Sequence, residues 1–314
     1  MSNGWQLQAT ADGSPTLFSD RFGECFHSDR GARREALETY VQPAELERFE
    51  RGQKLTVLDV GVGLGYNSAC LLEAISARGL QLRWWGLELE ATPLRRVLSD
   101  PGYRGLWQPT TLAMLEQIAA SAEPEGGRIW RQSCGSGELL WGDARQRVQP
   151  LLEHQAGQLD LVLLDAFSPR HCPELWSQEF LGSLARLLQP QGRLITYCAA
   201  AAVRASLAAA GLELASLTVS SLGASDRWGE RWSQGTIASP TPLPPSHHYR
   251  PLSAMEREHL STRAAEPYRD ADGRSEASAI LKRRAEAQQR SNATSTTAWR
   301  ARWHRGAGDL RDEG

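Results

Sequence analysis

Three glycines at alternate positions mark the segment of this chain with the clearest potential for ligand binding. Gly61, Gly63 and Gly65 follow the apolar run VLDV and precede a helical pattern. Alternate glycines allow a tight turn and let backbone N–H groups approach a ligand, while the next helix offers its positive N-terminus. The dinucleotide fingerprint has glycine or alanine at its sixth position, where this chain has Tyr66, so the loop favours S-adenosylmethionine over NAD or FAD. The alternative is that the glycines only permit close packing of helix on strand.

Two acidic positions follow later strands of the same pattern. Glu88 ends QLRWWGLE, about one strand–helix unit after the glycines. In a nucleoside-binding α/β fold, an acid at this strand end accepts hydrogen bonds from both ribose hydroxyls, and Glu90 is the second candidate for that role. Asp143, in WGDAR, is predicted to contact an adenine amino group, or else only to cap the helix that follows it.

A third acid, Asp165, ends the buried strand LDLVLLD and is followed by AFSP. Carboxylates are costly to bury, and the carboxyl edge of a central strand is where open α/β sheets bind ligands. Phe167, Pro169 and Trp176 supply rigid apolar and aromatic surface suited to stacking a flat base. Alternatively, the proline only shapes a loop and Trp176 only anchors a helix to the core. Tyr197, after the next strand, is a weaker candidate for the same pocket.

These residues need a sheet whose strands end at one edge. Strand and helix patterns alternate along the chain, as a doubly wound parallel sheet requires, and LDLVLL is continuously apolar, as in a strand buried on both faces. The sequence predicts seven strands, with the glycine loop after the first of them, and a loop at 121–138. The clearest predicted elements are strands at LTVLDVG, 81–88, LDLVLLD, GRLITYCA, 212–220 and 234–239, and helices within 30–50, 67–78, 175–188 and AAVRASLAAAG.

Length and composition predict one main domain. The chain has 314 residues, of which 41% are hydrophobic and 23% charged, and its net charge is −2. This length and hydrophobic content suffice for one substantial core and an appendage. We expect a cap segment at 1–50, the catalytic domain at 51–239 and, after the proline-rich SPTPLPPSHHYRP, a basic helical extension at 240–314 that leaves the sheet. Five cysteines without CxxC spacing predict reduced thiols and no zinc, and the lack of a leader or membrane span predicts a cytoplasmic protein.

Taken together, the segments resemble the MnmC-like tRNA methyltransferases over about residues 20–240. LDAFSPRHCPELWSQEFL (164–181) is the most specific of them; FHSDRGARREALETY, VLDVGVGLGYN, GDAR and ITYCAAAAVRASLAAAGL match as well. The resemblance implies a class I methyltransferase fold with S-adenosylmethionine as donor. It also implies methylation of 5-aminomethyl-2-thiouridine at the wobble position of tRNA. Bifunctional members add an FAD-dependent oxidase domain; nothing here matches one, so only methyl transfer is expected, as in the stand-alone (MnmD-type) members.

The resemblance also implies roles for particular residues. Donor binding falls on Gly61, Gly63, Gly65, Glu88 and Asp143. Asp165 lies beside the acceptor amine, which it holds or deprotonates, while Phe167 and Trp176 exclude water. His27, with Ser28 and Gly31, belongs to a motif expected to close over the site.

The predicted macromolecular partner is tRNA. Candidate phosphate contacts are Arg30, Arg33, Arg34, Arg170, Arg227, Arg231, Lys282, Arg283, Arg284, Arg300, Arg302 and Arg305. The end of the chain, Trp299 to Arg305, is predicted to grip RNA by stacking and charge. Two alternatives remain: an enzyme that alkylates a small amine, related to aminopropyltransferases, and a nucleic-acid-binding module without catalysis.

Overall fold

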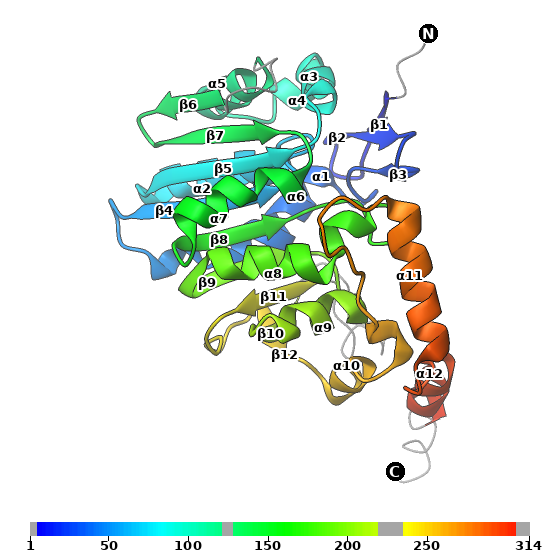
Figure 1. Ribbon diagram of the computed structural model, residues 1–314. Coiled ribbons are helices and arrows are strands. Elements are labelled where there is room, and N and C mark those ends of the chain that lie inside the picture. The colour runs from blue at the N-terminus through cyan, green and yellow to red at the C-terminus, as the bar shows by residue number, and fades with distance from the viewer. Residues whose placement is uncertain (1–4, 121–127, 219–234, 306–314) are drawn as a thin grey trace, which may run out of the picture.

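The computed structural model describes residues 5–120, 128–218 and 235–305, and within them one large sheet organises the chain (Figure 1). Its strand order is β12-β10-β11-β9-β8-β4-β5-β7-β6. Strands β9, β8, β4, β5 and β7 are parallel, whereas the strands at both ends pair antiparallel. The strands are β4 (Lys54–Val60), β5 (Gln81–Glu88), β6 (Arg128–Gln132), β7 (Gly135–Trp141), β8 (Leu159–Leu164), β9 (Leu188–Thr196), β10 (Glu213–Leu217), β11 (Thr236–Ser239) and β12 (Tyr249–Pro251).

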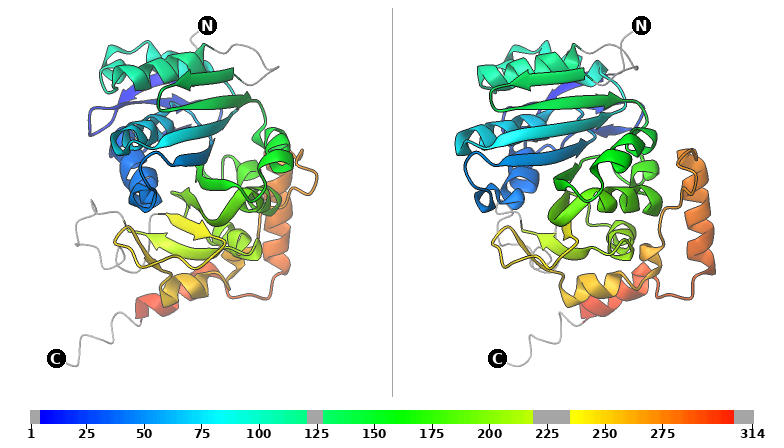
Figure 2. Two further views of the ribbon diagram at one scale, coloured as in Figure 1. Left: turned by 90° about the vertical axis from the view of Figure 1, so that its left-hand side faces the viewer. Right: turned by 60° about the vertical axis from the view of Figure 1, so that its left-hand side comes forward.

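Helices cover both faces of this sheet (Figures 1 and 2). One core, around α2 and α5, packs under one face, and a second, around α7, α8 and α9, packs under the other. Every residue of β8 is buried, as expected for a central parallel strand. The predicted class I, Rossmann-like methyltransferase fold is therefore confirmed. The helices are α1 (Ala32–Glu35), α2 (Tyr66–Arg78), α3 (Thr92–Leu98), α4 (Pro101–Arg104), α5 (Pro109–Ala119), α6 (Ala144–Arg147), α7 (Gln149–Gln155), α8 (Gln178–Leu187), α9 (Ala201–Ala209), α10 (Ala254–His259), α11 (Ala277–Arg290) and α12 (Thr296–Arg305).

The described sheet has two more strands than the sequence predicted. Strand β6 lies in the segment predicted to be a loop, and it forms because Trp130 is buried against Trp84, with ring centroids 6.4 Å apart. Strand β12 lies in the segment predicted to leave the sheet, where it pairs antiparallel with β10. As an edge strand it tolerates Pro251, whose missing N–H would interrupt a central strand. The proline-rich segment thus returns to the sheet.

The N-terminal residues form a small separate sheet and an irregular helical stretch. Strands β1 (Trp5–Ala9), β2 (Pro15–Ser19) and β3 (Glu24–Cys25) pair antiparallel beyond the carboxyl ends of β5 and β7 (Figure 1). The predicted helix within 30–50 is broken into short helical pieces, and Glu45 adopts a left-handed backbone conformation at φ 49° between two of them. Pro43 lies just before this break.

The C-terminal residues pack on the domain. Helix α11 runs along one side of the molecule, and α10 and α12 lie together below the sheet (Figure 2). Ile280 is fully buried in the second core together with Tyr268. None of the described helices has the length and apolarity needed to cross a bilayer, and the described residues contain no cluster of His, Cys, Asp or Glu that could hold a metal ion.

Candidate active site

A cavity of about 520 Å³ lies at the carboxyl edge of the parallel strands. This volume is within the range of small-molecule sites, roughly 300–1,000 Å³. Each central strand contributes to its wall where the strand ends: Gly61 after β4, Glu88 on β5, Asp143 after β7, Asp165 after β8 and Tyr197 after β9. The structure thus brings together the acids and glycines that the sequence singled out at four strand ends.

The glycine loop forms the cavity wall nearest to α2. Gly61 has φ +81°, and a Cβ there would lie 2.5 Å from the carbonyl oxygen of Asp165. Gly63 has φ +54°, and a Cβ there would lie 3.0 Å from the Phe26 ring. Both positions therefore require glycine, for conformation and for space. Gly65, at φ +82°, begins α2 but does not line the cavity.

Glu88 is held in one orientation at the end of β5. Its Oε2 accepts a hydrogen bond from Gly63 N at 2.7 Å, and its Oε1 accepts one from Leu89 N at 2.6 Å. Burial raises the pKa of Glu88, although these backbone hydrogen bonds oppose the rise. Oε1 also accepts from Glu90 N at 3.2 Å. A carboxylate has about four acceptor positions, so about one remains for a ribose hydroxyl. Glu90 also lines the cavity, beyond the end of the strand.

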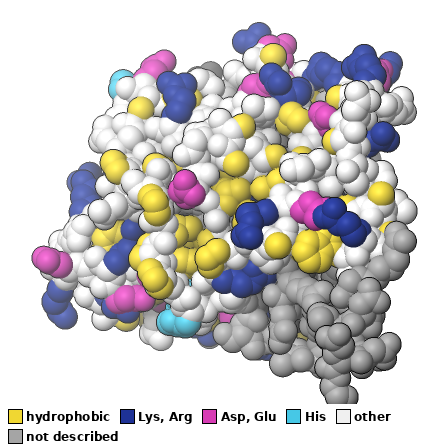
Figure 3. Space-filling view, turned by 90° about the horizontal axis from the view of Figure 1, so that it is seen from below, with side chains coloured by type: hydrophobic (Ala, Val, Ile, Leu, Met, Phe, Trp, Pro, Cys, Tyr) yellow, Lys and Arg dark blue, Asp and Glu magenta, His cyan; other side chains and the backbone are white. Residues whose placement is uncertain are grey.

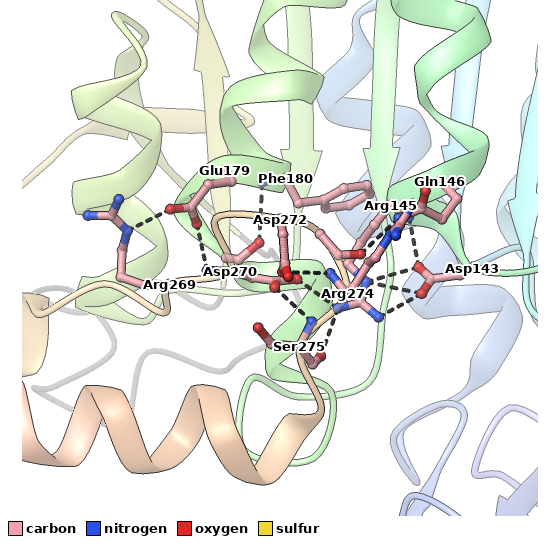
Figure 4. Close-up of polar contacts among 12 residues, drawn as sticks. Asp143, Arg145, Gln146, Glu179, Phe180, Arg269, Asp270, Asp272, Arg274 and Ser275 are labelled. Carbon is pink, nitrogen blue, oxygen red and sulfur yellow. Dashed lines mark hydrogen bonds and ion pairs between the residues drawn. The ribbon is translucent and has the colours of Figure 1, made fainter.

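Asp143 lines the cavity and also caps α6. Its carboxylate accepts a hydrogen bond from the backbone N–H of Arg145 at 3.0 Å, so Asp143 caps the helix, as the second interpretation of the sequence predicted. It also pairs with the Arg145 guanidinium, at 3.0 Å from Nε and 2.6 Å from Nη2 (Figure 4). The carboxylate remains 38% exposed. The cap and a contact to a ligand are therefore compatible.

Asp165 lies directly after the buried strand β8, within the cavity wall. Asn67 Nδ2 donates to its Oδ2 at 2.7 Å, and the Tyr40 hydroxyl donates to the neighbouring backbone carbonyl of Leu164 at 3.3 Å. Burial and then the negative charge of Glu35 raise the pKa of Asp165 to about 7, against the lowering effect of Tyr40 and Asn67. A carboxyl group with such a pKa can accept and release a proton near neutrality, which suits an acid–base role.

An aromatic wall closes the cavity between the N-terminal segment and the loop after β8. Phe167 stacks on Phe22 with ring centroids 4.3 Å apart and meets Phe26 edge-on at 4.9 Å. Ser168 donates to Glu24 from its backbone N–H at 3.0 Å and from its hydroxyl at 2.5 Å. The sequence did not reveal Phe22, Glu24 and Phe26 as site residues, because nothing local distinguishes them from ordinary hairpin residues.

His27 lies in the same wall, as the predicted closing motif requires. Its Nδ1 is 3.2 Å from the Thr16 hydroxyl, and its ring meets Tyr66 edge-on at 4.9 Å. Burial lowers the pKa of His27 to about 4. The ring is therefore neutral at physiological pH and adds no positive charge to the cavity.

Two predicted substrate contacts do not reach the cavity wall. Pro169 and Trp176 are absent from the lining, and Trp176 is fully buried. Its Nε1 donates to the backbone carbonyl of Phe167 at 2.7 Å, and its ring meets Tyr197 edge-on at 5.9 Å. Direct stacking of a substrate on Trp176 therefore has no geometric support. Its position instead suits an anchor that holds Phe167 in place.

The residues present fit S-adenosylmethionine, the donor of the methyltransferase fold. Gly61 and Gly63 leave bare backbone at a place that any Cβ would obstruct. Glu88 keeps about one acceptor position for a ribose hydroxyl, and Asp143, 38% exposed, lines the cavity where an adenine amine would lie. The lining has seven carboxylates against two arginines, which favours a cationic sulfonium over a phosphate.

Comparisons with known proteins agree with this geometry. Residues 131–220 match a family model described as S-adenosyl-L-methionine-dependent methyltransferase. The chain is 31% identical over 229 residues to the tRNA 5-methylaminomethyl-2-thiouridine biosynthesis bifunctional protein MnmC of Pseudomonas aeruginosa, covering 67% of this chain and 32% of that protein. The protein of the same name from Polaromonas naphthalenivorans is 28% identical over 209 residues, covering 66% and 32%.

A solved structure matches over most of the chain. The crystal structure of MnmC2 from Aquifex aeolicus aligns with a TM-score of 0.71 and 28% identity, covering 92% of this chain and 87% of that one. The chain spans about a third of the length of the bifunctional relatives. From the fold, the site and these relatives, the chain is an MnmC-like, S-adenosylmethionine-dependent methyltransferase domain.

Proposed function

We propose that this chain transfers a methyl group from S-adenosylmethionine to the primary amine of 5-aminomethyl-2-thiouridine at the wobble position of tRNA. The proposal draws on the relatives whose names specify biosynthesis of the methylaminomethyl nucleoside. The observation that carries it is Asp165, a half-buried carboxyl group with a pKa of about 7 beside the glycine loop. Such a group is suited to a reaction in which an amine loses a proton.

The charge of the cavity supports an amine as the acceptor. Its seven carboxylates include Glu24, Glu35 and Asp165 near the aromatic wall, and its two arginines are Arg21 and Arg145. An acidic pocket attracts an ammonium group and repels the phosphates of the RNA backbone. We infer that the modified base enters the cavity while the backbone stays outside, as in other enzymes that act on an extruded base.

The residues of the site then have separable roles. Bound S-adenosylmethionine supplies an electrophilic methyl group on a positively charged sulfur. Asp165 holds the acceptor nitrogen in line and takes its proton at Oδ1 or Oδ2, while Asn67 fixes the orientation of its carboxyl group. Phe167, packed on Phe22, offers its ring to the flat base and excludes water.

The surface that holds the tRNA remains a proposal. Three candidate arginines already pair with acids: Arg30 and Arg34 with Glu38, at 3.5 and 2.9 Å, and Arg33 with Glu73, at 3.3 Å. Arg227 and Arg231 lie outside the described residues. On the face seen from below, Lys and Arg side chains are scattered and do not form one patch (Figure 3). On this face, dispersed contacts to phosphates therefore suit the chain better than a single basic groove.

In the Trp299 to Arg305 end that is predicted to grip RNA, Trp299 is not available for stacking. Its ring is 3% exposed and stacks on His259, with centroids 4.2 Å apart, so no face is open to a base. Arg302 pairs with Glu258. Arg283 and Arg284 donate to backbone carbonyls of residues 264–269, which gives both a structural role.

A nucleoside analysis tests the proposal. The purified chain is incubated with S-adenosylmethionine and tRNA that carries the aminomethyl nucleoside, and digested nucleosides are identified by mass spectrometry. We expect the wobble nucleoside to gain one methyl group and the free aminomethyl nucleoside to react far more slowly. Equal reaction with the free nucleoside would favour the small-amine alternative. Binding of the tRNA without methyl transfer would favour a non-catalytic module.

A further inference from the structure

The C-terminal extension reaches the donor side of the cavity through one turn. In this turn, which we call the strap (residues 268–275), the Asp270 carboxylate is fully buried. Its Oδ2 accepts from Arg145 Nη1 at 2.7 Å, and its Oδ1 accepts from Ser275 N at 3.0 Å. The carbonyl of Ser275 accepts from the same Arg145 nitrogen at 2.9 Å (Figure 4). The strap therefore holds one edge of the guanidinium.

The opposite edge of the same guanidinium holds Asp143. Nε and Nη2 of Arg145 both donate to that carboxylate, and the Arg145 side chain is only 12% exposed. A guanidinium is planar, so fixing Nη1 also fixes the direction in which Nε and Nη2 point. Asp270 thereby determines where Arg145 places the Asp143 carboxylate in the cavity wall.

The strap is itself attached firmly to the domain. Glu179, at the start of α8, accepts from Arg269 Nε at 2.7 Å and from Asp270 N at 2.9 Å. The carbonyl of Tyr268 accepts from Gln178 N at 2.9 Å, and the carbonyl of Gly273 accepts from Gln146 at 2.9 Å. Contacts to both α6 and α8 make the strap a rigid support for Arg145.

We propose that Asp270 is a positioning residue for donor binding, which acts through Arg145 on Asp143. This inference rests on the proposed function, in which Asp143 binds the adenine end of S-adenosylmethionine. With two carboxylates on one guanidinium, Asp143 keeps acceptor capacity for an amine. Without Asp270, Nη1 of Arg145 keeps only the carbonyl of Ser275, whose own position depends on the hydrogen bond from Ser275 N to Asp270. The guanidinium is then no longer fixed, and the Asp143 carboxylate that it holds loses its orientation.

Calorimetric titration of the full chain with S-adenosylmethionine and with S-adenosylhomocysteine tests this inference. For Asp270→Asn we expect Kd to rise about tenfold for both compounds, the size of one misplaced hydrogen-bonding group. The kcat at saturating donor should stay within about twofold, because Asp270 touches no reacting group. The control is Ile280→Ala, which opens a cavity in the same extension without touching Arg145. It should lower the melting temperature and leave Kd unchanged.

A double-mutant cycle identifies the route. In an Asp143→Asn background, adding Asp270→Asn should change Kd by less than about twofold, because the residue through which it acts is already altered. An undiminished effect in that background would overturn the inference, as would wild-type Kd in folded Asp270→Asn. If that variant does not fold, Arg145→Lys replaces it. A single ammonium cannot span both acids, so unchanged affinity there would also overturn the inference. Failure of the wild-type chain to bind either compound would instead contradict the proposed function.

Discussion

Replacing Asp165 by asparagine removes the proton acceptor while keeping the size of the side chain and its hydrogen bond from Asn67. Because a positioned acid–base group contributes roughly a hundredfold or more, we expect methyl transfer to fall by about that factor. Donor affinity should fall far less than the rate, since Gly61, Gly63 and Glu88 form the predicted donor contacts. The loss should therefore appear in the chemical step.

The pKa of about 7 determines how this loss depends on pH. With that pKa, Asp165 is roughly one-tenth ionised at pH 6 and nine-tenths ionised at pH 8. Under donor-limiting conditions, the ratio of the wild-type rate to the Asp165→Asn rate should rise about tenfold over this interval. The ionisation of the substrate amine affects both proteins equally, so it cancels in the ratio.

The assay measures initial rates of methyl incorporation into aminomethyl tRNA. Asp160→Asn is the matched control. Asp160 lies at the amino end of the same strand β8, away from the cavity, where its carboxylate accepts from Thr56 and Gln189. This control should keep wild-type rates and pH dependence while it is folded. A rate ratio that stays flat between about pH 6 and 8 would refute the role of Asp165 as proton acceptor.

Two further substitutions test the glycine loop and the buried acid behind it. Gly63→Val should abolish donor binding measured by calorimetry, because the new Cβ would meet the Phe26 ring and the backbone φ of +54° disfavours valine. The control is Gly157→Val, which has a similar φ of +71° but open space around it, and it should bind the donor normally. Equal loss of binding in both variants would contradict the steric argument. Burial raises the pKa of Asp59 to about 8, so its folded form binds a proton that the unfolded form releases above about pH 4. The free energy of unfolding therefore falls as pH rises through this range. Measured by urea unfolding, this fall should be smaller in Asp59→Asn by about 1.4 kcal/mol per pH unit between about pH 5 and 7. Parallel stability curves for the variant and the wild type would refute this assignment.

The sheet and its ligand edge could be predicted because buried parallel strands have a distinctive sequence. LDLVLL is apolar at every position, and it becomes β8 with every residue buried. Once β4, β5 and β8 are assigned, parallel topology alone brings the residues at their carboxyl ends together. The placement of Gly61, Gly63, Glu88 and Asp165 in one cavity follows from that rule.

Other parts of the site depend on contacts that no local pattern encodes. Phe22 is 145 positions from Phe167 in the chain, yet their rings stack. Trp176 fits two roles equally well from sequence, and only its complete burial separates an anchor from a stacking surface. The extension was predicted to be an appendage because its sequence is polar, but a single buried acid, Asp270, connects it to the cavity.

The charge of the bound donor should change the pKa of Asp165. Asp165 has a raised pKa because burial and the negative charge of Glu35 oppose its ionisation. A cation bound in the same cavity acts in the opposite sense and lowers that pKa. A larger fraction of the carboxyl groups is therefore ionised, and free to accept a proton, when a sulfonium donor is present than in the empty site, although each is then a weaker base. The ratio of the wild-type rate to the Asp165→Asn rate should therefore reach its midpoint at a lower pH with saturating donor than under donor-limiting conditions. An unchanged midpoint would mean that the positive charge of the donor does not act on Asp165.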